Sequence, residues 1–295
     1  MERGFAAYHP AVNFLFFAGA ILLGMFFMHP AFLLLSLLCS LSYYLLQKGR
    51  EGTRFLLQAL LLFFMISLLN PVFNTRGDTV LFTCFGGRPY TLEALGYGLS
   101  TGSMFLTVVL WFSCYHVVMT SDKLLYLFGR FLPAVSMLLC MVLRFVPNLK
   151  AKAETIGNAR RCIGKSPTDG TKREGLEHGT EILSVLTSWA LEGAVVTADS
   201  MRSRGYGCGR RSHFSNYRMT LRDWVLLTIM LLCIAGTVLC AALGGTAAAY
   251  FPTVQIPRPG PAAVGGFICY GIFLAIPTAI KIWEEVLWRI LRSKI

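Results

Sequence analysis

Long stretches without any charged residue constrain the fold of this chain more than any other feature. Residues 11–47, 55–75, 94–121, 224–257 and 259–280 contain no Asp, Glu, Lys or Arg. An α-helix needs about 20 apolar residues to cross a bilayer core, and lipid offers no partner for an unpaired backbone group. Charged residues make up only 14% of the chain, against about 25% in a soluble domain. The sequence therefore predicts an all-α, polytopic membrane protein.

Helix-breaking residues divide these stretches into about six apolar runs. His29-Pro30 ends the first run, the charged segment 48–54 separates the second from the third, and Asn70-Pro71 ends the third. Arg3 is the only Lys or Arg before the first run, and a second apolar run follows at once. This pattern does not fit a cleavable signal peptide. We expect a polar loop from Asn70 to Tyr90 and membrane helices over residues 12–27, 31–46, 55–69, 95–119, 224–249 and 262–280.

Small residues inside the runs point to helix packing rather than to chemistry. Gly98 and Gly102 form a small-xxx-small pair, a spacing that allows close contact with a neighbouring helix. Most of the nine cysteines lie in apolar runs, where Cys behaves as a small hydrophobe. No CxxC pair or zinc-type spacing occurs, so the sequence indicates no metal site.

A long basic insert separates the fourth run from the fifth. Residues 119–223 hold 16 Lys and Arg against 9 Asp and Glu. We therefore expect three parts, namely N-terminal transmembrane helices (1–120), an insert (121–223) and C-terminal transmembrane helices (224–295).

The distribution of positive charge predicts the orientation. If the 48–54 loop is cytosolic, only Arg76, Arg88 and Arg258 lie on the opposite side, which leaves 24 of the 27 Lys and Arg in the cytosol. This asymmetry follows the positive-inside rule. We expect a multi-pass protein of the cell membrane, with both termini and the insert in the cytosol.

The insert itself has a helical pattern. Apolar residues recur at helical spacing from Leu124 to Leu149, and Pro133 and Pro147 should kink or divide this helix. Its apolar core is short for a span, so we interpret residues 131–147 as an embedded or interfacial helix, with a tilted span as the alternative. A basic helix over 150–164, a loop over 165–179 and an amphipathic helix over 181–201 are expected to follow.

Two arginine-bearing tips end these helices. Ala159-Arg160-Arg161 ends the first, and Ser203-Arg204-Gly205 ends the second, where glycines at 205, 207 and 209 stop the helix. Arginine stays charged at any working pH and presents five donors in a fork that holds a carboxylate. A helix with an exposed apolar face and an arginine tip indicates a partner at each of these surfaces.

Motifs for nucleotides and nucleic acids are incomplete. Gly164-Lys165-Ser166 resembles the end of a P-loop, but Ala159 stands where the first glycine belongs and no strand precedes it. The chain is therefore not expected to bind ATP itself. Aromatic residues are sparse among the basic ones, which favours contact with lipid headgroups over nucleic acid.

Two other classes of membrane protein were weighed as alternatives. A self-contained secondary transporter needs a polar site at mid-membrane, and the runs lack charge. His116, at the cytosolic end of the fourth run, is interpreted as a packed or interfacial residue. A membrane enzyme acting on lipid headgroups needs a carboxylate or histidine cluster. Glu192 and Asp199 are instead interpreted as partners of neighbouring arginines.

Two stretches of the insert resemble a known family. They are residues 121–164, which include Leu143-Arg144-Phe145-Val146-Pro147, and residues 198–207. Both resemble the transmembrane T component (EcfT/CbiQ-like) of energy-coupling factor transporters, ABC-type importers of vitamins and transition-metal ions. In that family each tip carries an Ala-Arg-X signature that docks in a groove of an ATPase subunit. This chain departs from the signature at Arg161, where a small residue is commoner, and at Ser203, which replaces alanine.

The resemblance implies a non-catalytic coupling subunit. Its expected partners are two cytosolic ABC-type ATPase subunits, a small substrate-binding membrane subunit (S component) and the bilayer, with no nucleic acid. ATP and magnesium are expected on the ATPase subunits, and no cofactor, metal or catalytic residue in this chain. The ATPase-coupling residues implied are Ala159, Arg160, Arg161, Ser203, Arg204 and Gly205.

Overall fold

The computed structural model describes residues 4–74, 77, 79–84, 88–129, 132–164, 172–209, 217–246, 248, 250–251 and 260–292. It forms two compact units. The membrane unit comprises Met1–Leu124 and Tyr217–Ile295, and the insert unit comprises Leu125–Asn216.

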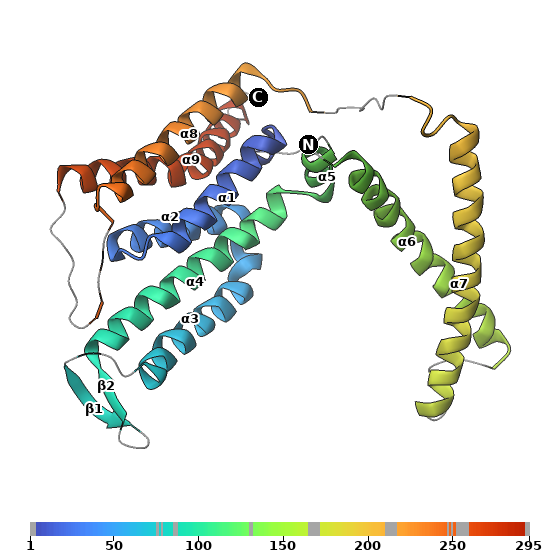
Figure 1. Ribbon diagram of the computed structural model, residues 1–295, viewed down its shortest axis with the longest axis horizontal. Coiled ribbons are helices and arrows are strands. Elements are labelled where there is room, and N and C mark those ends of the chain that lie inside the picture. The colour runs from blue at the N-terminus through green and yellow to red at the C-terminus, as the bar shows by residue number, and fades with distance from the viewer. Residues whose placement is uncertain are drawn as a thin grey trace. The chain divides into compact units, whose positions relative to one another are not determined.

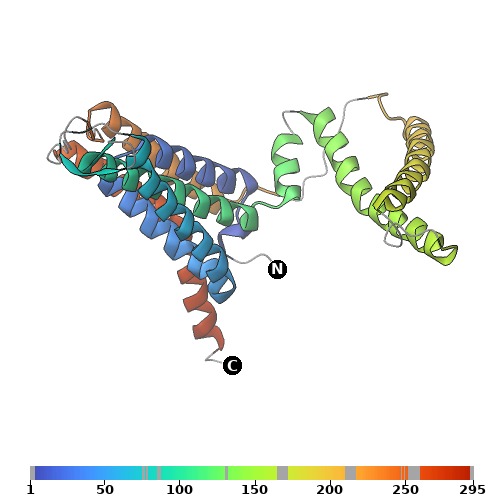
Figure 2. The same cartoon turned by 90° about the horizontal axis from the view of Figure 1, so that it is seen from below.

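The membrane unit is a bundle of helices (Figures 1 and 2). His9 and His29 each begin a helix: the ring nitrogen accepts a hydrogen bond from the backbone N–H two residues later, and proline occupies the first helical position. The two short 3-10 turns are η1 (Gly4–Ala7) and η2 (Gly49–Gly52). The main helices are α1 (Pro10–Phe26), α2 (Pro30–Lys48), α3 (Thr53–Phe73), α4 (Leu92–Val118), α8 (Leu221–Ala242) and α9 (Pro261–Arg292).

Aromatic side chains from three helices form the core of the membrane unit. The centroid of the Phe16 ring on α1 lies 5.4 Å from the ring centroid of Trp111 on α4 and 5.1 Å from that of Phe273 on α9. All three side chains are fully buried. Edge-to-face and tilted contacts of this kind stabilise aromatic clusters beyond the area that they bury. Helix α1 therefore packs at the centre of the bundle.

Within the described residues, seven helices are long and apolar enough to cross a membrane: α2, α3, α4, α8, α9 and the two long helices of the insert unit, α6 (Pro133–Cys162) and α7 (Lys172–Ser203). The all-α, polytopic fold class is confirmed. All six predicted apolar runs form helices, namely α1 to α4, α8 and α9, although α1 has only 17 residues. The prediction did not include α6 and α7, the two insert helices that are also long and apolar enough to span. Each contains an 18-residue window with at most two charged residues, and no residue of these windows is buried.

A β-hairpin occupies part of the segment that was expected to be a polar loop. Strand β1 (Val80–Cys84) pairs antiparallel with β2 (Arg88–Thr91). The Thr79 hydroxyl donates a hydrogen bond of 2.6 Å to Glu93, whose side chain is buried at the start of α4. The prediction of a loop was wrong because glycine and proline dominate the composition of this segment, while the short Val80–Phe82 run is enough for a two-stranded ladder.

Helices α3 and α4 approach closely at the predicted glycine pair. A Cβ atom added to Gly98 would lie 2.7 Å from the backbone oxygen of Ser67, and one added to Gly102 would lie 3.2 Å from that of Phe63. A backbone oxygen cannot rotate away as a side chain can. The two glycines thus allow the helix backbones to meet, as their spacing predicts.

We expect Gly98→Ala to destabilise the membrane unit by about 1–3 kcal/mol, the usual range for overpacking a tight contact. The added methyl group forces α3 and α4 apart. The matched control is Gly96→Ala, because a Cβ atom there meets nothing within 4 Å. Thermal unfolding in detergent measures both variants. Equal melting temperatures for the two would contradict the close packing.

The N-terminal segment contacts both chain junctions of the insert. Lys123, which is fully buried, donates hydrogen bonds to the carbonyl oxygens of Ala6 at 2.8 Å and Val118 at 3.1 Å. At the other junction, Asp223 forms a capping box with Thr220 and accepts the backbone N–H of His9 at 3.1 Å. Residues 6–9 therefore form hydrogen bonds with the chain just after α4 and with the start of α8.

The insert unit contains the long helices α6 and α7, and α5 (Ser121–Gly129) leads into it. Pro133 begins α6, and Pro147 lies inside this helix without dividing it. The two expected helices over 131–164 are therefore one. Helix α7 starts nine residues before the predicted residue 181, because Lys and Glu in the segment interpreted as a loop are good helix formers. Residues 165–171 of that expected loop lie outside the described residues.

Candidate functional site

The first arginine-bearing tip lies in the last turn of α6. Ala159 and Arg161 are exposed there. The N–H of Gly164 donates to the carbonyl oxygen of Arg161 at 3.0 Å, and the φ angle of Gly164 is +75°. Glycine adopts this left-handed conformation without steric cost, so the helix ends and leaves its last turn open to a partner. Lys165 and Ser166 of the P-loop-like motif lie outside the described residues.

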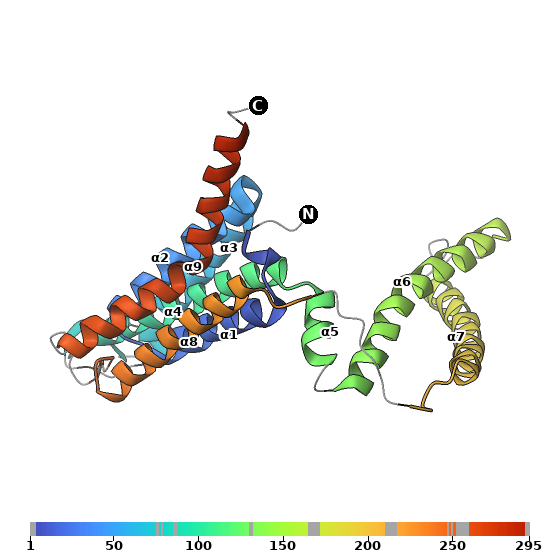
Figure 3. The ribbon, with the colours of Figure 1, turned by 90° about the horizontal axis from the view of Figure 1, so that it is seen from above.

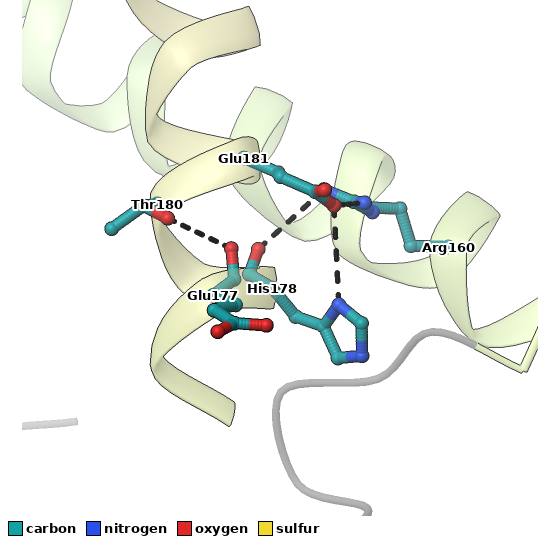
Figure 4. Close-up of polar contacts among 5 residues, drawn as sticks. All are labelled: Arg160, Glu177, His178, Thr180 and Glu181. Carbon is teal, nitrogen blue, oxygen red and sulfur yellow. Dashed lines mark hydrogen bonds and ion pairs between the residues drawn. The ribbon is translucent and has the colours of Figure 1, made fainter. Parts of the chain in front are cut away.

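Arg160 points to α7 rather than outward (Figure 4). Its guanidinium forms an ion pair with Glu181, and Nη1 lies 3.5 Å from the carbonyl oxygen of His178. The Nδ1 atom of His178 lies 3.9 Å from the same Glu181 carboxylate. Only 16% of the Arg160 side chain is exposed. The central residue of the first tip is thus engaged within the insert unit.

A second contact joins the two helices at an aromatic pair. The rings of Phe145 on α6 and Trp189 on α7 are stacked, with centroids 6.3 Å apart and an angle of 4° between their planes. The Lys152 ammonium lies 5.5 Å from the centre of the Trp189 ring, within cation–π range. Helices α6 and α7 cross in this region (Figures 1 and 3). Helices α6 and α7 are therefore held together by two contacts, the Arg160–Glu181 ion pair and the Phe145–Trp189 stack.

The second tip ends α7. The N–H of Tyr206 donates to the carbonyl oxygen of Met201 and that of Gly205 to Arg202, both at 3.0 Å, which is the Schellman pattern. Gly205 has the positive φ of +80° that this pattern requires, so the predicted glycine stop is confirmed. The Ser203 hydroxyl bonds back to the carbonyl oxygens of Asp199 and Ser200 at 3.0 Å.

Arg204 is exposed at the C-cap of this helix. Within the insert unit, the C-terminal ends of α6 and α7 point to different sides of the crossing (Figures 1 and 3). The structure therefore does not bring the two tips together into one pocket. It presents Arg161 and Arg204 at two separate ends.

The remaining polar residues singled out from the sequence lie on exposed surfaces. His116 is exposed in the last turn of α4, and Glu192 and Asp199 are exposed on α7. Within the described ranges, no group of three or more His, Cys, Asp or Glu side chains is placed to hold a metal ion.

Sequence reasoning missed Glu181, because the residue that faces Arg160 depends on the register between two helices.

A family model supplies an independent comparison. The model for CbiQ, described as a cobalt transport protein, matches residues 5–215. The chain belongs to the CbiQ family. The match covers well over half of the chain and includes both arginine-bearing ends. No curated protein matches the chain. CbiQ membership confirms the resemblance found in the insert and makes this protein a multi-pass membrane component of a transport system.

Proposed function

We propose that this CbiQ-family chain is the transmembrane coupling subunit, or T component, of an energy-coupling factor importer. Two cytosolic ATPase subunits bind the ends of α6 and α7. A separate, small membrane subunit binds the solute, a vitamin or a transition-metal ion. The observation that carries this proposal is the family match over residues 5–215, which includes two helices that both end in an exposed arginine.

The chemistry of the two ends supports docking to acidic grooves. Arg161 and Arg204 are exposed, each beside a glycine-stopped helix end. A guanidinium pairs with a carboxylate through two parallel hydrogen bonds, which fixes orientation as well as affinity. Two such contacts at separate helix ends give each ATPase subunit its own binding site.

The contacts between α6 and α7 support transmission of movement. ATP binding and hydrolysis on the partner subunits change the separation of their grooves and displace the two helix ends. The Arg160–Glu181 and Phe145–Trp189 contacts couple the helices, so a displacement of one helix also moves the other.

The apolar faces of the insert helices support contact with a membrane-embedded partner. Large hydrophobic side chains remain exposed along both helices, and an apolar surface of this kind needs lipid or protein to cover it. We propose that the substrate-binding subunit covers part of this surface and is reoriented when the helices move. These side chains include Leu138, Val142, Val146, Leu183, Leu191 and Val195.

Purification of the tagged chain from its native membrane tests the proposed function. We expect two ATPase subunits and a small, apolar membrane subunit to co-purify, and ATP-dependent uptake in vesicles that contain all four chains. A chain that purifies alone and transports solute by itself would make it a secondary transporter and contradict the proposal.

A further inference from the structure

The chain enters and leaves the insert through two connections, the entry connection (residues 119–124) and the exit connection (residues 217–223). Both connections belong to the membrane unit. Relative motion of compact units within one chain is the usual expectation. Whatever joins the two connections therefore decides whether they move separately or together. The N-terminal segment of the membrane unit (residues 4–9) joins them.

Two charged side chains attach the N-terminal segment to the connections. Lys123 in the entry connection donates a hydrogen bond to the carbonyl oxygen of Ala6 at 2.8 Å. Asp223 in the exit connection accepts one from the backbone N–H of His9 at 3.1 Å. Ala6 and His9 are three residues apart, and an extended chain of that length spans at most about 11 Å. A displacement of one connection is therefore passed through this segment to the other.

The N-terminal segment is itself packed into the aromatic core of the membrane unit. Phe5 is fully buried, and its ring centroid lies 5.3 Å from that of Phe16 and 6.0 Å from that of Tyr8. The side-chain amide of Asn13 donates to the carbonyl oxygen of Tyr8 at 3.4 Å. A chain terminus is usually poorly ordered unless contacts of this kind hold it. The segment is therefore a fixed part of the bundle, and both connections are attached to that part.

Burial makes both attachments depend on the N-terminal segment. Lys123 is fully buried, and only 4% of Asp223 is exposed. A charge in such a place is stable only when hydrogen bonds compensate for the lost water. Lys123 finds an acceptor on the segment, and Asp223 finds a donor there besides the N–H and the hydroxyl of Thr220. Displacing the segment removes a partner from two buried charges at once, so the two attachments open together.

We infer that the N-terminal segment is a link that couples the entry connection to the exit connection, so that both are held or released together. Lys123 and Asp223 are the positioning residues of this link. Its use rests on the proposed function: when ATPase subunits displace the insert helices, linked connections pass the displacement to α4 and α8 at the same time. Without the link, each connection moves separately.

Hydrogen exchange of the full chain in detergent, followed by mass spectrometry of its peptides, tests the link. Lys123→Met changes only the entry connection. We nevertheless expect exchange of the backbone amides at residues 223–228, in the start of α8, to rise about fivefold, the effect of losing one buried hydrogen bond. Residues 92–100, at the opposite end of α4, are the internal reference and should exchange as in the wild type.

The matched control for this variant is Thr220→Ala. It removes the hydroxyl of the capping box but keeps the bond between His9 and Asp223. We expect this variant to raise exchange at the start of α8 without changing exchange at the entry connection.

A substitution within the N-terminal segment gives a second test, which decides the question if Lys123→Met does not fold. His9→Pro removes the backbone N–H that Asp223 accepts, and proline tolerates the φ angle of −55° that His9 adopts. His9→Ala is the matched control, because it removes the ring that caps α1 but keeps this N–H. We expect His9→Pro to raise exchange at both connections, and His9→Ala to raise it only at the start of α1.

Two results overturn the inference. Exchange that rises only at the substituted connection shows that the connections are independent. Exchange that rises evenly, residues 92–100 included, shows a general loss of stability. Failure of the proposed function looks different: no ATPase subunit co-purifies with the wild-type chain, while the exchange pattern of its variants stays as expected.

Discussion

Replacing both exposed arginines, Arg161→Ala with Arg204→Ala, should remove the ATPase subunits from the assembly and abolish ATP-dependent uptake. Each guanidinium lies at a separate helix end, so the two losses are expected to add. At about tenfold for each contact, the combined loss of affinity is about 100-fold. Quantitative mass spectrometry of the purified assembly measures the remaining ATPase.

The double variant should still insert and fold, because neither side chain contributes to the packed bundle of the membrane unit. Its melting temperature in detergent is expected to match that of the wild type, which provides the control for misfolding. Retention of both ATPases in a correctly folded double variant would contradict docking through these arginines.

Replacing the buried lysine at the junction with the insert should have the largest effect on stability. Lys123→Met keeps the length of the side chain but leaves the carbonyl oxygens of Ala6 and Val118 without this donor. A buried acceptor left unpaired costs about 1–3 kcal/mol, so we expect a loss of about 2–4 kcal/mol.

The matched control for the buried lysine is Lys150→Met. Lys150 is exposed on α6, so the same chemical change there removes no buried contact. Thermal unfolding followed by tryptophan fluorescence compares the two variants. A Lys123→Met protein as stable as the control would show that the N-terminal segment does not depend on this lysine.

Much of the membrane unit is predictable because lipid imposes strong rules on sequence. A segment that crosses a bilayer needs a long apolar run and must satisfy its own backbone, which leaves the helix as the main solution. His29-Pro30 is also informative, since the same two residues end one run and cap the next helix. The hairpin over 80–91 was missed because its strands are short and lie among turn-forming residues.

The insert shows where pattern alone fails. Pro147 removes one backbone hydrogen bond, yet the helix continues through it, because its other turns keep their bonds on both sides. The spacing of Arg160 and Arg161 indicates a basic tip, but not which arginine faces outward. That choice depends on the rotation of α6 relative to α7 and on the position of Glu181, and residue spacing within one helix determines neither.

We propose that ATPase subunits cover the ends of α6 and α7, and an exposed cysteine lies at each of these ends. Cys162 directly follows Arg161, Cys208 follows the second tip, and both thiols are exposed. Cys140, also exposed, lies in the apolar part of α6 and serves as the internal control. Thiol alkylation at each site is measured by mass spectrometry on the purified assembly and on the chain after its ATPases are removed. We expect Cys162 and Cys208 to be protected from alkylation in the assembly and to become reactive when the ATPases are removed, while the reactivity of Cys140 stays unchanged. Equal reactivity of Cys162 and Cys208 in both samples would contradict the proposal.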